Sequence, residues 1–243
     1  EKDIDGILIT LPNFGDEKSV LETLKLSDTD VPVMVHAFPD EIGKMDRKNR
    51  RDSFCGKISV CNNLKQAKIP FTNTEKHVED PNSDVFERDM ERFGRICKTV
   101  AAVRKSRLGV VGLRPNPFQT VRYSEKILES NGISVENISL IKTVEEAKRM
   151  ESKDPKVKKK IEEIQESFVL EDIPDEAVKK TAKLTVVLSD WVAENDLDTV
   201  AFQCWPEIED YYGIAPCGAL SIMSESMVPS ACESDVMGSL SMY

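Results

Sequence analysis

The stretch DGILITLPNFGDEKSVLETLKLSDTDVPVMVHA, residues 5–37, decides the fold that the sequence predicts. It begins and ends with short apolar runs, residues 5–11 and 31–37, which are typical of buried strands in a parallel sheet. Between them, Asp16 is a candidate helix cap, and the apolar residues within 20–26 have helical spacing. A strand, a helix and a second strand in this order indicate a βαβ unit.

The rest of the chain repeats this alternation of apolar strands and helices. The patterns predict helices over residues 58–67, 84–105, 123–131, 144–150, 156–165 and 176–194, and strands over residues 69–72, 107–113, 134–141 and 199–204. We therefore predict an α/β protein of two successive Rossmann/flavodoxin-like lobes, with parallel sheets flanked by helices. The predicted domains are residues 1–106 and residues 107–243.

The composition is that of a globular protein, with 31% charged and 40% hydrophobic residues among 243. A net charge of −10 argues against non-specific nucleic-acid binding, which needs clustered cations. Two basic runs, residues 44–51 and 153–160, are accompanied by acids and are typical of solvated faces. No apolar run approaches the roughly 20 residues that span a bilayer. Six scattered cysteines without a CxxC pair favour reduced thiols in the cytoplasm.

Acids gather in the C-terminal stretch, residues 201–243, among small residues, prolines and cysteines. They form two groups: Glu207, Glu209 and Asp210, then Glu233 and Asp235. The first group follows a predicted strand, where ligands gather in open α/β sheets, and the second precedes a predicted helix. Acids in such surroundings are poorly placed for solvation, and we expect them to hold a divalent metal. The alternative for Glu233 is an N-cap or first-turn acid of the predicted helix at residues 236–243, favoured by the helix dipole.

The loop after the strand at residues 31–37 is a second candidate position. His36 and Asp40 lie there, at the predicted carboxyl end of that strand. The alternative for His36 is a structural histidine, because its neighbours are apolar. Farther on, the glycine-containing turn at residues 52–57 is a weak signal for anion binding at a helix start.

Five motifs, in the same order along the chain, resemble the L-fucose isomerase/L-arabinose isomerase family in its fucose isomerase-like branch. They are DGILITLPNFGDE (5–17), VPVMVHAFPDE (31–41), RDSFCGKISVCNNL (51–64), LRPNPFQTVRYSEKILES (113–130) and the stretch 203–243. The resemblance covers nearly the whole chain. It is specific because the motifs occur together and in order.

The resemblance implies a metal-dependent aldose–ketose isomerase, which moves a proton between C1 and C2 of a sugar through an enediol. In the family, two carboxylates and a histidine hold Mn²⁺, and a neighbouring subunit of a trimer or hexamer helps to close the site. Matched to the family motifs, the two carboxylates fall on Glu209 and Glu233, with Glu207 and Asp235 as alternates. The same two glutamates are the predicted proton-transfer groups. Oxygen ligands suit Mn²⁺ or another hard cation such as Mg²⁺.

For contacts with the sugar we predict Gln203 and Trp205 from the same stretch, together with His36. The expected partner is a small sugar, which the sequence does not identify, and we expect no nucleic acid or membrane partner. Compared with the family, the chain starts inside the first domain and stops before the C-terminal domain that supplies the metal-binding histidine. We therefore expect a fragment of an isomerase that is inactive on its own.

The alternative function is a non-catalytic, two-lobed α/β sugar-binding or regulatory module. The paired acids distinguish the two possibilities. A binding module has little reason to bury facing carboxylates, because like charges at close range are costly without a cation.

Overall fold

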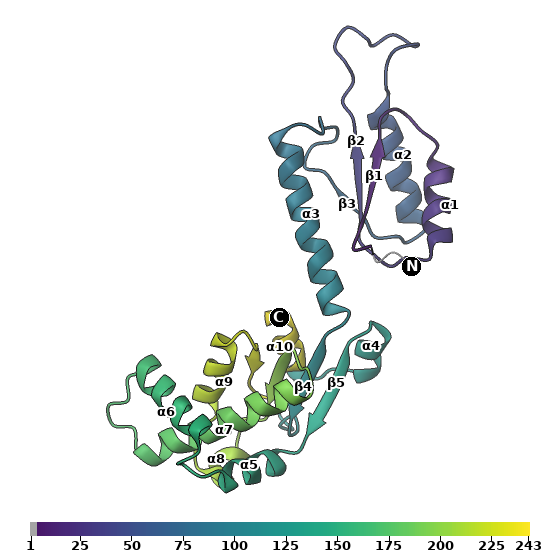
Figure 1. The fold of residues 1–243 in the computed structure, drawn as a ribbon. Coiled ribbons are helices and arrows are strands. Elements are labelled where there is room, and N and C mark those ends of the chain that lie inside the picture. Colours follow the sequence, from purple (N-terminus) through teal and green to yellow (C-terminus); the bar gives the residue numbers. More distant parts are fainter. Residues whose placement is uncertain (1–3) are drawn as a thin grey trace. The chain divides into compact units, whose positions relative to one another are not determined.

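A computed structural model describes residues 4–243, which form two compact units, Glu1–Ala102 and Val103–Tyr243 (Figure 1). Each unit contains one parallel sheet flanked by helices. The predicted fold class, α/β with two successive lobes, is therefore confirmed. None of the helices in the described part of the chain is long and apolar enough to cross a membrane.

The first unit is built on a three-stranded sheet with the order β1-β2-β3. Its elements are β1 (Ile7–Leu11), α1 (Glu17–Ser27), β2 (Val33–Ala37), α2 (Ser53–Gln66), β3 (Thr72–Asn73) and α3 (Asp84–Val103). Strand β1 pairs with β2 in register from Ile7↔Val33 to Leu11↔Ala37. The candidate cap at Asp16 is confirmed, since its side chain accepts hydrogen bonds from the backbone N–H groups of Lys18 and Ser19.

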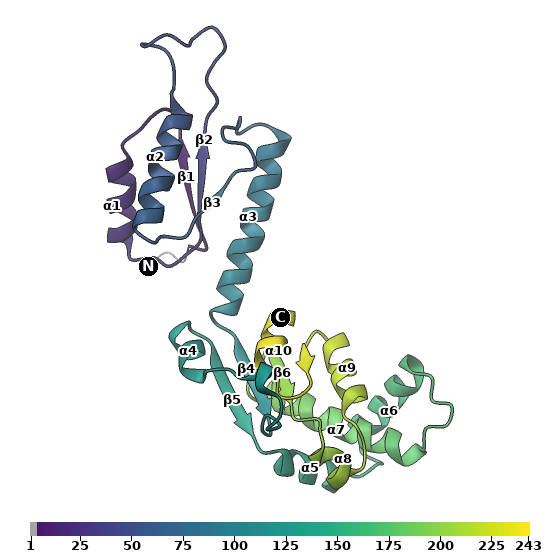
Figure 2. The ribbon, with the colours of Figure 1, turned by 180° about the vertical axis from the view of Figure 1, so that it is seen from behind.

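Alternation along β2 produces the two helical layers of this unit. Val33, Val35 and Ala37 pack with residues of α1 and α2, whereas Met34 packs with Phe93 of α3. Helices α1 and α2 accordingly lie on one face of the sheet and α3 on the other (Figures 1 and 2). Successive side chains of a strand point to opposite faces, so a strand covered on both sides reads as a continuous apolar run.

The second unit has a four-stranded parallel sheet with the order β5-β4-β6-β7. Its elements are β4 (Arg107–Val111), η1 (Gln119–Val121), α4 (Glu125–Ser130), β5 (Ser134–Ile138), α5 (Leu140–Arg149), α6 (Pro155–Ser167), α7 (Asp175–Glu194), β6 (Thr199–Phe202), α8 (Glu207–Tyr212), α9 (Cys217–Glu225), β7 (Ser230–Ala231) and α10 (Val236–Met242). Strand β6 is buried along its whole length, so the loop that follows it is anchored in the core.

The same alternation divides the core of the second unit. Val200 and Phe202 pack in a cluster with α5, α7, α8 and α9, whereas Ala201 packs with residues of α4 and α10. Helix α6 lies against α7 through a smaller cluster around Val157 and Ile164. Helices thus cover both faces of the sheet. Ligands can approach it at the carboxyl ends of the strands.

Two predicted boundaries are wrong, and three short elements were missed. The strand predicted over residues 134–141 ends at Ile138, and Leu140 already begins α5. The helix predicted from residue 58 begins at Ser53. Elements α8, α9 and β7 were not predicted, because the stretch 205–232 is rich in small residues and prolines that give no clear periodicity.

Candidate functional site

The strand order places a natural ligand crevice in the second unit. The chain goes from β4 to β5 on one side of the sheet and then to β6 on the other. In open α/β sheets, ligands bind outside the carboxyl ends of the strands where the order reverses in this way. The loops after β4, β5, β6 and β7 all meet at this edge, because all pairings are parallel.

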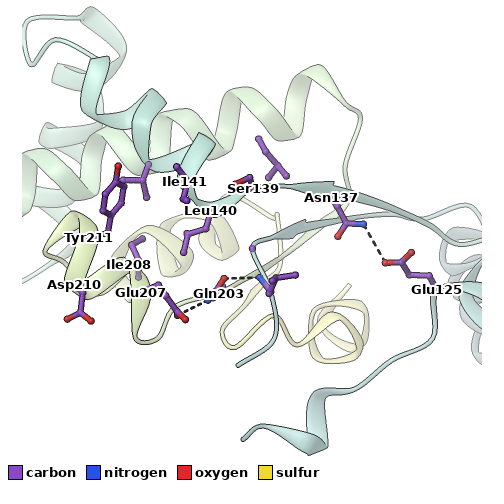
Figure 3. A pocket seen from close by; sticks show the side chains of 14 residues that line it. Glu125, Asn137, Ser139, Leu140, Ile141, Gln203, Glu207, Ile208, Asp210 and Tyr211 are labelled. Atoms are coloured by element: carbon purple, nitrogen blue, oxygen red, sulfur yellow. Dashed lines mark hydrogen bonds between the residues drawn. The ribbon is translucent and has the colours of Figure 1, made fainter. Parts of the chain in front are cut away.

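A cavity of about 980 Å³ lies at this edge (Figure 3). Its polar lining includes Asn137 near the end of β5, Ser139 just after it, and Glu207, Asp210 and Tyr211 of α8. Carboxylate, amide and hydroxyl groups on one wall can exchange hydrogen bonds with the hydroxyls of a polyol. Apolar side chains such as Leu140 and Ile208 form the rest of the wall.

Gln203 joins the loops after β4 and β6 at the reversal of strand order. Its Oε1 accepts a hydrogen bond of 2.8 Å from the backbone N–H of Leu113, and its Nε2 donates one of 2.7 Å to Glu207 Oε2. Figure 3 shows both bonds converging on the one side chain. Gly112, at φ 79°, makes this approach possible, because a Cβ there would overlap the Gln203 side chain.

The first turn of α8 carries three acids, Glu207, Glu209 and Asp210. Glu207 and Asp210 line the cavity, while Glu209 is exposed on the same short helix. The peptide bond before this helix, Trp205–Pro206, is cis. The Trp205 ring is partly exposed and stacks on Phe118 with ring centroids 5.9 Å apart.

Glu233 is the most unusual side chain at this edge. It lies between β7 and α10, and it and Ser234 have φ values of 62° and 53°. Its Oε1 accepts a hydrogen bond of 3.2 Å from the Cys204 thiol, and its Oε2 is buried without any hydrogen-bond partner among the described residues. Positive φ at a non-glycine residue and an unpaired buried oxygen are both costly, and such features concentrate at functional sites.

Two thiols surround this carboxylate. Burial raises the pKa of Cys204 to about 12, so this thiol is protonated at neutral pH and can donate to Glu233. Burial also raises the pKa of Cys232, which lies next to Glu233 in the chain. The surroundings of Glu233 are therefore neutral, and no cationic side chain in the described part of the protein forms an ion pair with it.

Of the two predicted metal carboxylates, Glu209 lies in helix α8, which follows β6, and Glu233 lies in the turn that follows the adjacent strand β7. Within residues 4–243, no three His, Cys, Asp or Glu side chains are arranged to enclose a metal ion. The buried, unpaired oxygen of Glu233 nevertheless suits one ligand of a hard cation, which takes oxygen donors. The alternate Asp235 has another task, because its side chain caps α10 by accepting from the Gly238 N–H at 2.8 Å.

His36 lies in the first unit and is fully buried. Its Nδ1 is 2.6 Å from Thr10 Oγ1, and its Nε2 is 2.8 Å from the Glu79 carbonyl oxygen. Both ring nitrogens are thus occupied, which favours the structural alternative over the predicted sugar contact. Asp40 accepts hydrogen bonds from the backbone N–H groups of Arg51 and Asp52, so it orders the loop that leads into α2.

Sequence reasoning named Gln203 and Glu207 but missed Leu113, Asn137 and Tyr211 of the cavity wall. Leu113 and Asn137 lie at or just after the carboxyl ends of β4 and β5, so the rule that ligands gather at strand ends could have found them. Tyr211 could not have been found in this way, because α8 was not predicted.

The comparisons with known proteins agree with the family named by the motifs. Residues 1–104 match the model of the fucose/sulfoquinovose isomerase N-terminal domain. The sulfoquinovose isomerase of Priestia aryabhattai is 24% identical over 241 residues, which are 99% of this chain and 52% of the relative. The sulfoquinovose isomerase of Alkalicoccus urumqiensis is 29% identical over 165 residues, 68% of this chain and 37% of the relative.

A third relative, the sulfoquinovose isomerase of Clostridium sp. (strain MSTE9), is 26% identical over 164 residues, 67% of this chain and 36% of the relative. The chain spans about half the length, 52%, of the Priestia relative. The resemblance to the fucose isomerase-like family is thereby confirmed, and these relatives are sugar aldose–ketose isomerases.

Proposed function

We propose that this chain, a relative of the fucose isomerase-like aldose–ketose isomerases, contributes the carboxylate half of a metal-assisted sugar isomerase site. The single observation that supports this most is Glu233. Its buried, unpaired carboxylate oxygen and its positive φ lie at the sheet edge that also holds a cavity with several polar side chains in its lining. A carboxylate held in this way at a cost to stability suits a ligand or a catalytic group better than a structural one.

Glu233, in the turn after β7, and Glu209, in helix α8, would hold the cation, Mn²⁺ or Mg²⁺. Once bound, such a cation polarises the sugar carbonyl and stabilises negative charge on its oxygen. The exposed carboxylate of Glu209 is free to take or return the proton that moves between C2 and C1. No cationic side chain among the described residues forms an ion pair with Glu233, so a bound cation would be its charge partner.

The cavity would orient the sugar beside these carboxylates. Gln203 fixes Glu207 by the 2.7 Å hydrogen bond, so one carboxylate oxygen is held in place while the other can accept from a sugar hydroxyl. Asp210 offers a further acceptor. The Tyr211 hydroxyl donates its proton to Glu145 Oε1 at 2.7 Å and can therefore only accept from a sugar hydroxyl. The exposed face of Trp205 can cover the apolar side of a sugar ring.

For the substrate we propose a sugar, with sulfoquinovose as the first candidate, since the relatives carry that name. We further propose a cytoplasmic homotrimer or homohexamer. These assignments rest on the family resemblance, whereas the metal and sugar groups rest on the residues described above.

The experiment is a proton-exchange assay. The chain is incubated in D₂O with Mn²⁺ and a panel of aldoses that includes sulfoquinovose, L-fucose and L-arabinose, and NMR follows deuterium entering at C2. This detects removal of the C2 proton, the step proposed for the carboxylate half of the site, although we expect no net isomerisation from this chain alone. The variants are Glu233→Gln, Glu209→Gln and, as a control, Glu225→Gln in the exposed part of α9.

We expect exchange with one or more aldoses that requires Mn²⁺, is lost in the first two variants and persists in the control. Sugar binding without Mn²⁺ dependence and without exchange would contradict the proposal. That result would favour the alternative, a non-catalytic sugar-binding module.

A further inference from the structure

The first unit contains a cavity of about 380 Å³ that the proposed isomerase site does not use. One wall is a stripe of α2 at helical spacing, formed by Phe54, Lys57, Ile58 and Cys61. The other wall is the segment that follows β3, residues 73–77. The cavity thus lies at the carboxyl end of the edge strand, where α/β sheets bind ligands.

Lys57 is the decisive residue of this cavity, because it is 5% exposed and yet carries an ammonium group. Its Nζ donates a hydrogen bond of 2.7 Å to Thr74 Oγ1, its one hydrogen bond to the described residues. The Thr74 hydroxyl donates its own proton to the Lys76 carbonyl oxygen at 2.8 Å, so it can only accept from Lys57. Two of the three ammonium protons therefore have no acceptor among residues 4–243.

The nearest acid does not complete the charge pair. Asp89 is buried close enough to attract Lys57, but its Oδ2 accepts a hydrogen bond of 2.9 Å from the backbone N–H of Glu75. No ion pair joins Lys57 to a carboxylate within residues 4–243. A buried cation with one neutral partner is costly, and an anion in the adjoining space would remove that cost.

Other groups around the cavity can also donate to an anion. The Asn73 side-chain oxygen accepts from the Cys61 thiol at 3.4 Å, which leaves its NH₂ group to serve as a donor. The His77 ring packs on Phe54 with centroids 5.1 Å apart and supplies a second polar group beside the cavity. Glu75, the one acid in the lining, is exposed and can turn towards solvent.

We propose that this cavity binds a small oxyanion, with the Lys57 ammonium as its charge partner and Asn73 and His77 as further donors. The ligand is either a free inorganic ion or the charged end of an organic sulfonate or phosphate. The volume falls within the range of small-ligand sites, and lysine is a common point-charge partner of such groups. The assignment does not depend on the isomerase reaction, because it uses no residue of the second unit.

The experiment titrates sulfate, phosphate and methanesulfonate into the chain by calorimetry, with the neutral dimethyl sulfone as a ligand control. Lys57→Met removes the charge and keeps most of the apolar stem, and Lys65→Met removes an exposed charge from the same helix. We expect Lys57→Met to weaken anion binding by about ten-fold or more, as for the loss of a charge-assisted hydrogen bond. Lys65→Met should stay within about two-fold of wild type, and dimethyl sulfone should not bind.

A second measurement uses the wild-type chain, so its result does not depend on whether Lys57→Met folds. In the wild-type chain, methanesulfonate should shift the NMR signals of the backbone amides at residues 73–77. Tighter binding of methanesulfonate than of sulfate would identify an organic head group as the ligand, and the reverse order would identify a free ion. Shifts confined to the basic run at residues 44–51, or equal affinity in Lys57→Met and wild type, would overturn the assignment. The Glu233→Gln variant should bind the anion normally, which separates this proposal from the isomerase proposal.

Discussion

Replacing Glu233 by asparagine should make the metal-free chain more stable, although the change removes a half-buried side chain. Asparagine adopts positive φ more readily than glutamate, and a left-handed conformation costs a typical residue roughly 1–2 kcal/mol. The unpaired buried Oε2 costs about 1–3 kcal/mol, which the shorter, uncharged side chain relieves in part. The lost hydrogen bond from Cys204 offsets about 1 kcal/mol of this gain. We therefore expect a net gain of about 1–2 kcal/mol in the free energy of unfolding.

The assay is urea unfolding in the presence of EDTA, followed by tryptophan fluorescence. Both tryptophans, Trp191 and Trp205, lie in the second unit, so the signal reports the unit that contains Glu233. Asp172→Asn is a matched control, because Asp172 lies in the same unit and also has positive φ, 67°, but is exposed. Its effect should stay within about 0.5 kcal/mol.

The same assay with saturating Mn²⁺ adds a second comparison. A cation present at about 100 times its dissociation constant should stabilise the wild type by about 2.7 kcal/mol and leave the asparagine variant unchanged. If Glu233→Asn instead lowers the stability of the metal-free chain by more than about 1 kcal/mol, the carboxylate is a satisfied structural group. Our interpretation of its geometry would then be wrong.

Three further substitutions test other parts of the account. His36→Ala should cost about 3 kcal/mol in urea unfolding followed by circular dichroism, because it opens a cavity and removes the hydrogen-bond partner of the Glu79 carbonyl and the Thr10 hydroxyl. His77→Ala, at an exposed position, should stay within about 0.5 kcal/mol. Gly112→Ala should lower the free energy of unfolding by about 3 kcal/mol, because its Cβ would overlap the buried Gln203 side chain. Gly213→Ala, at a similar φ of 77°, should cost about 1 kcal/mol. Equal losses in the two variants would refute the steric argument. Burial raises the pKa of Cys204 from an ordinary 9.0 to about 12. The neutral thiol therefore stabilises the folded chain fully below pH 9, and this contribution is lost as the pH rises from 9 towards 12. The difference in unfolding free energy between wild type and Cys204→Ala should therefore shrink above pH 9, and a difference that does not change with pH would contradict this.

The architecture could be predicted where strands are covered on both faces. Strand β2 was predicted from its unbroken apolar run, and the structure buries it completely. The strand at β5 was extended wrongly because Leu140 and Ile141 continue an apolar run. Those residues instead begin α5, whose buried positions Leu140, Val144 and Ala147 follow helical spacing. A short apolar run does not by itself distinguish the end of a strand from the start of a helix.

The candidate site could be predicted in its position but not in its geometry. The rule that ligands gather at the carboxyl ends of strands located Gln203 and the acids around it. The hydrogen bond from the Leu113 N–H to Gln203, however, depends on the pairing of β4 with β6, which one sequence does not reveal. The capping task that the sequence offered as an alternative for Glu233 belongs to Asp235 in the structure. The unpaired oxygen of Glu233 belongs to the turn after β7. This strand has only two residues, and no sequence pattern predicted it.

The central claim is that Glu233 and Glu209 are ligands of one divalent cation in the second unit. The measurement that tests it most directly is the Mn²⁺ affinity of the chain, determined by electron paramagnetic resonance of free Mn²⁺ for wild type, Glu233→Gln, Glu209→Gln and the control Glu225→Gln. We predict one Mn²⁺ site whose affinity falls by about ten-fold or more in each of the first two variants, as for the loss of a charged ligand, and does not change in the third. Equal affinity in Glu233→Gln and wild type, or the absence of any Mn²⁺ site in the wild-type chain, would contradict the account.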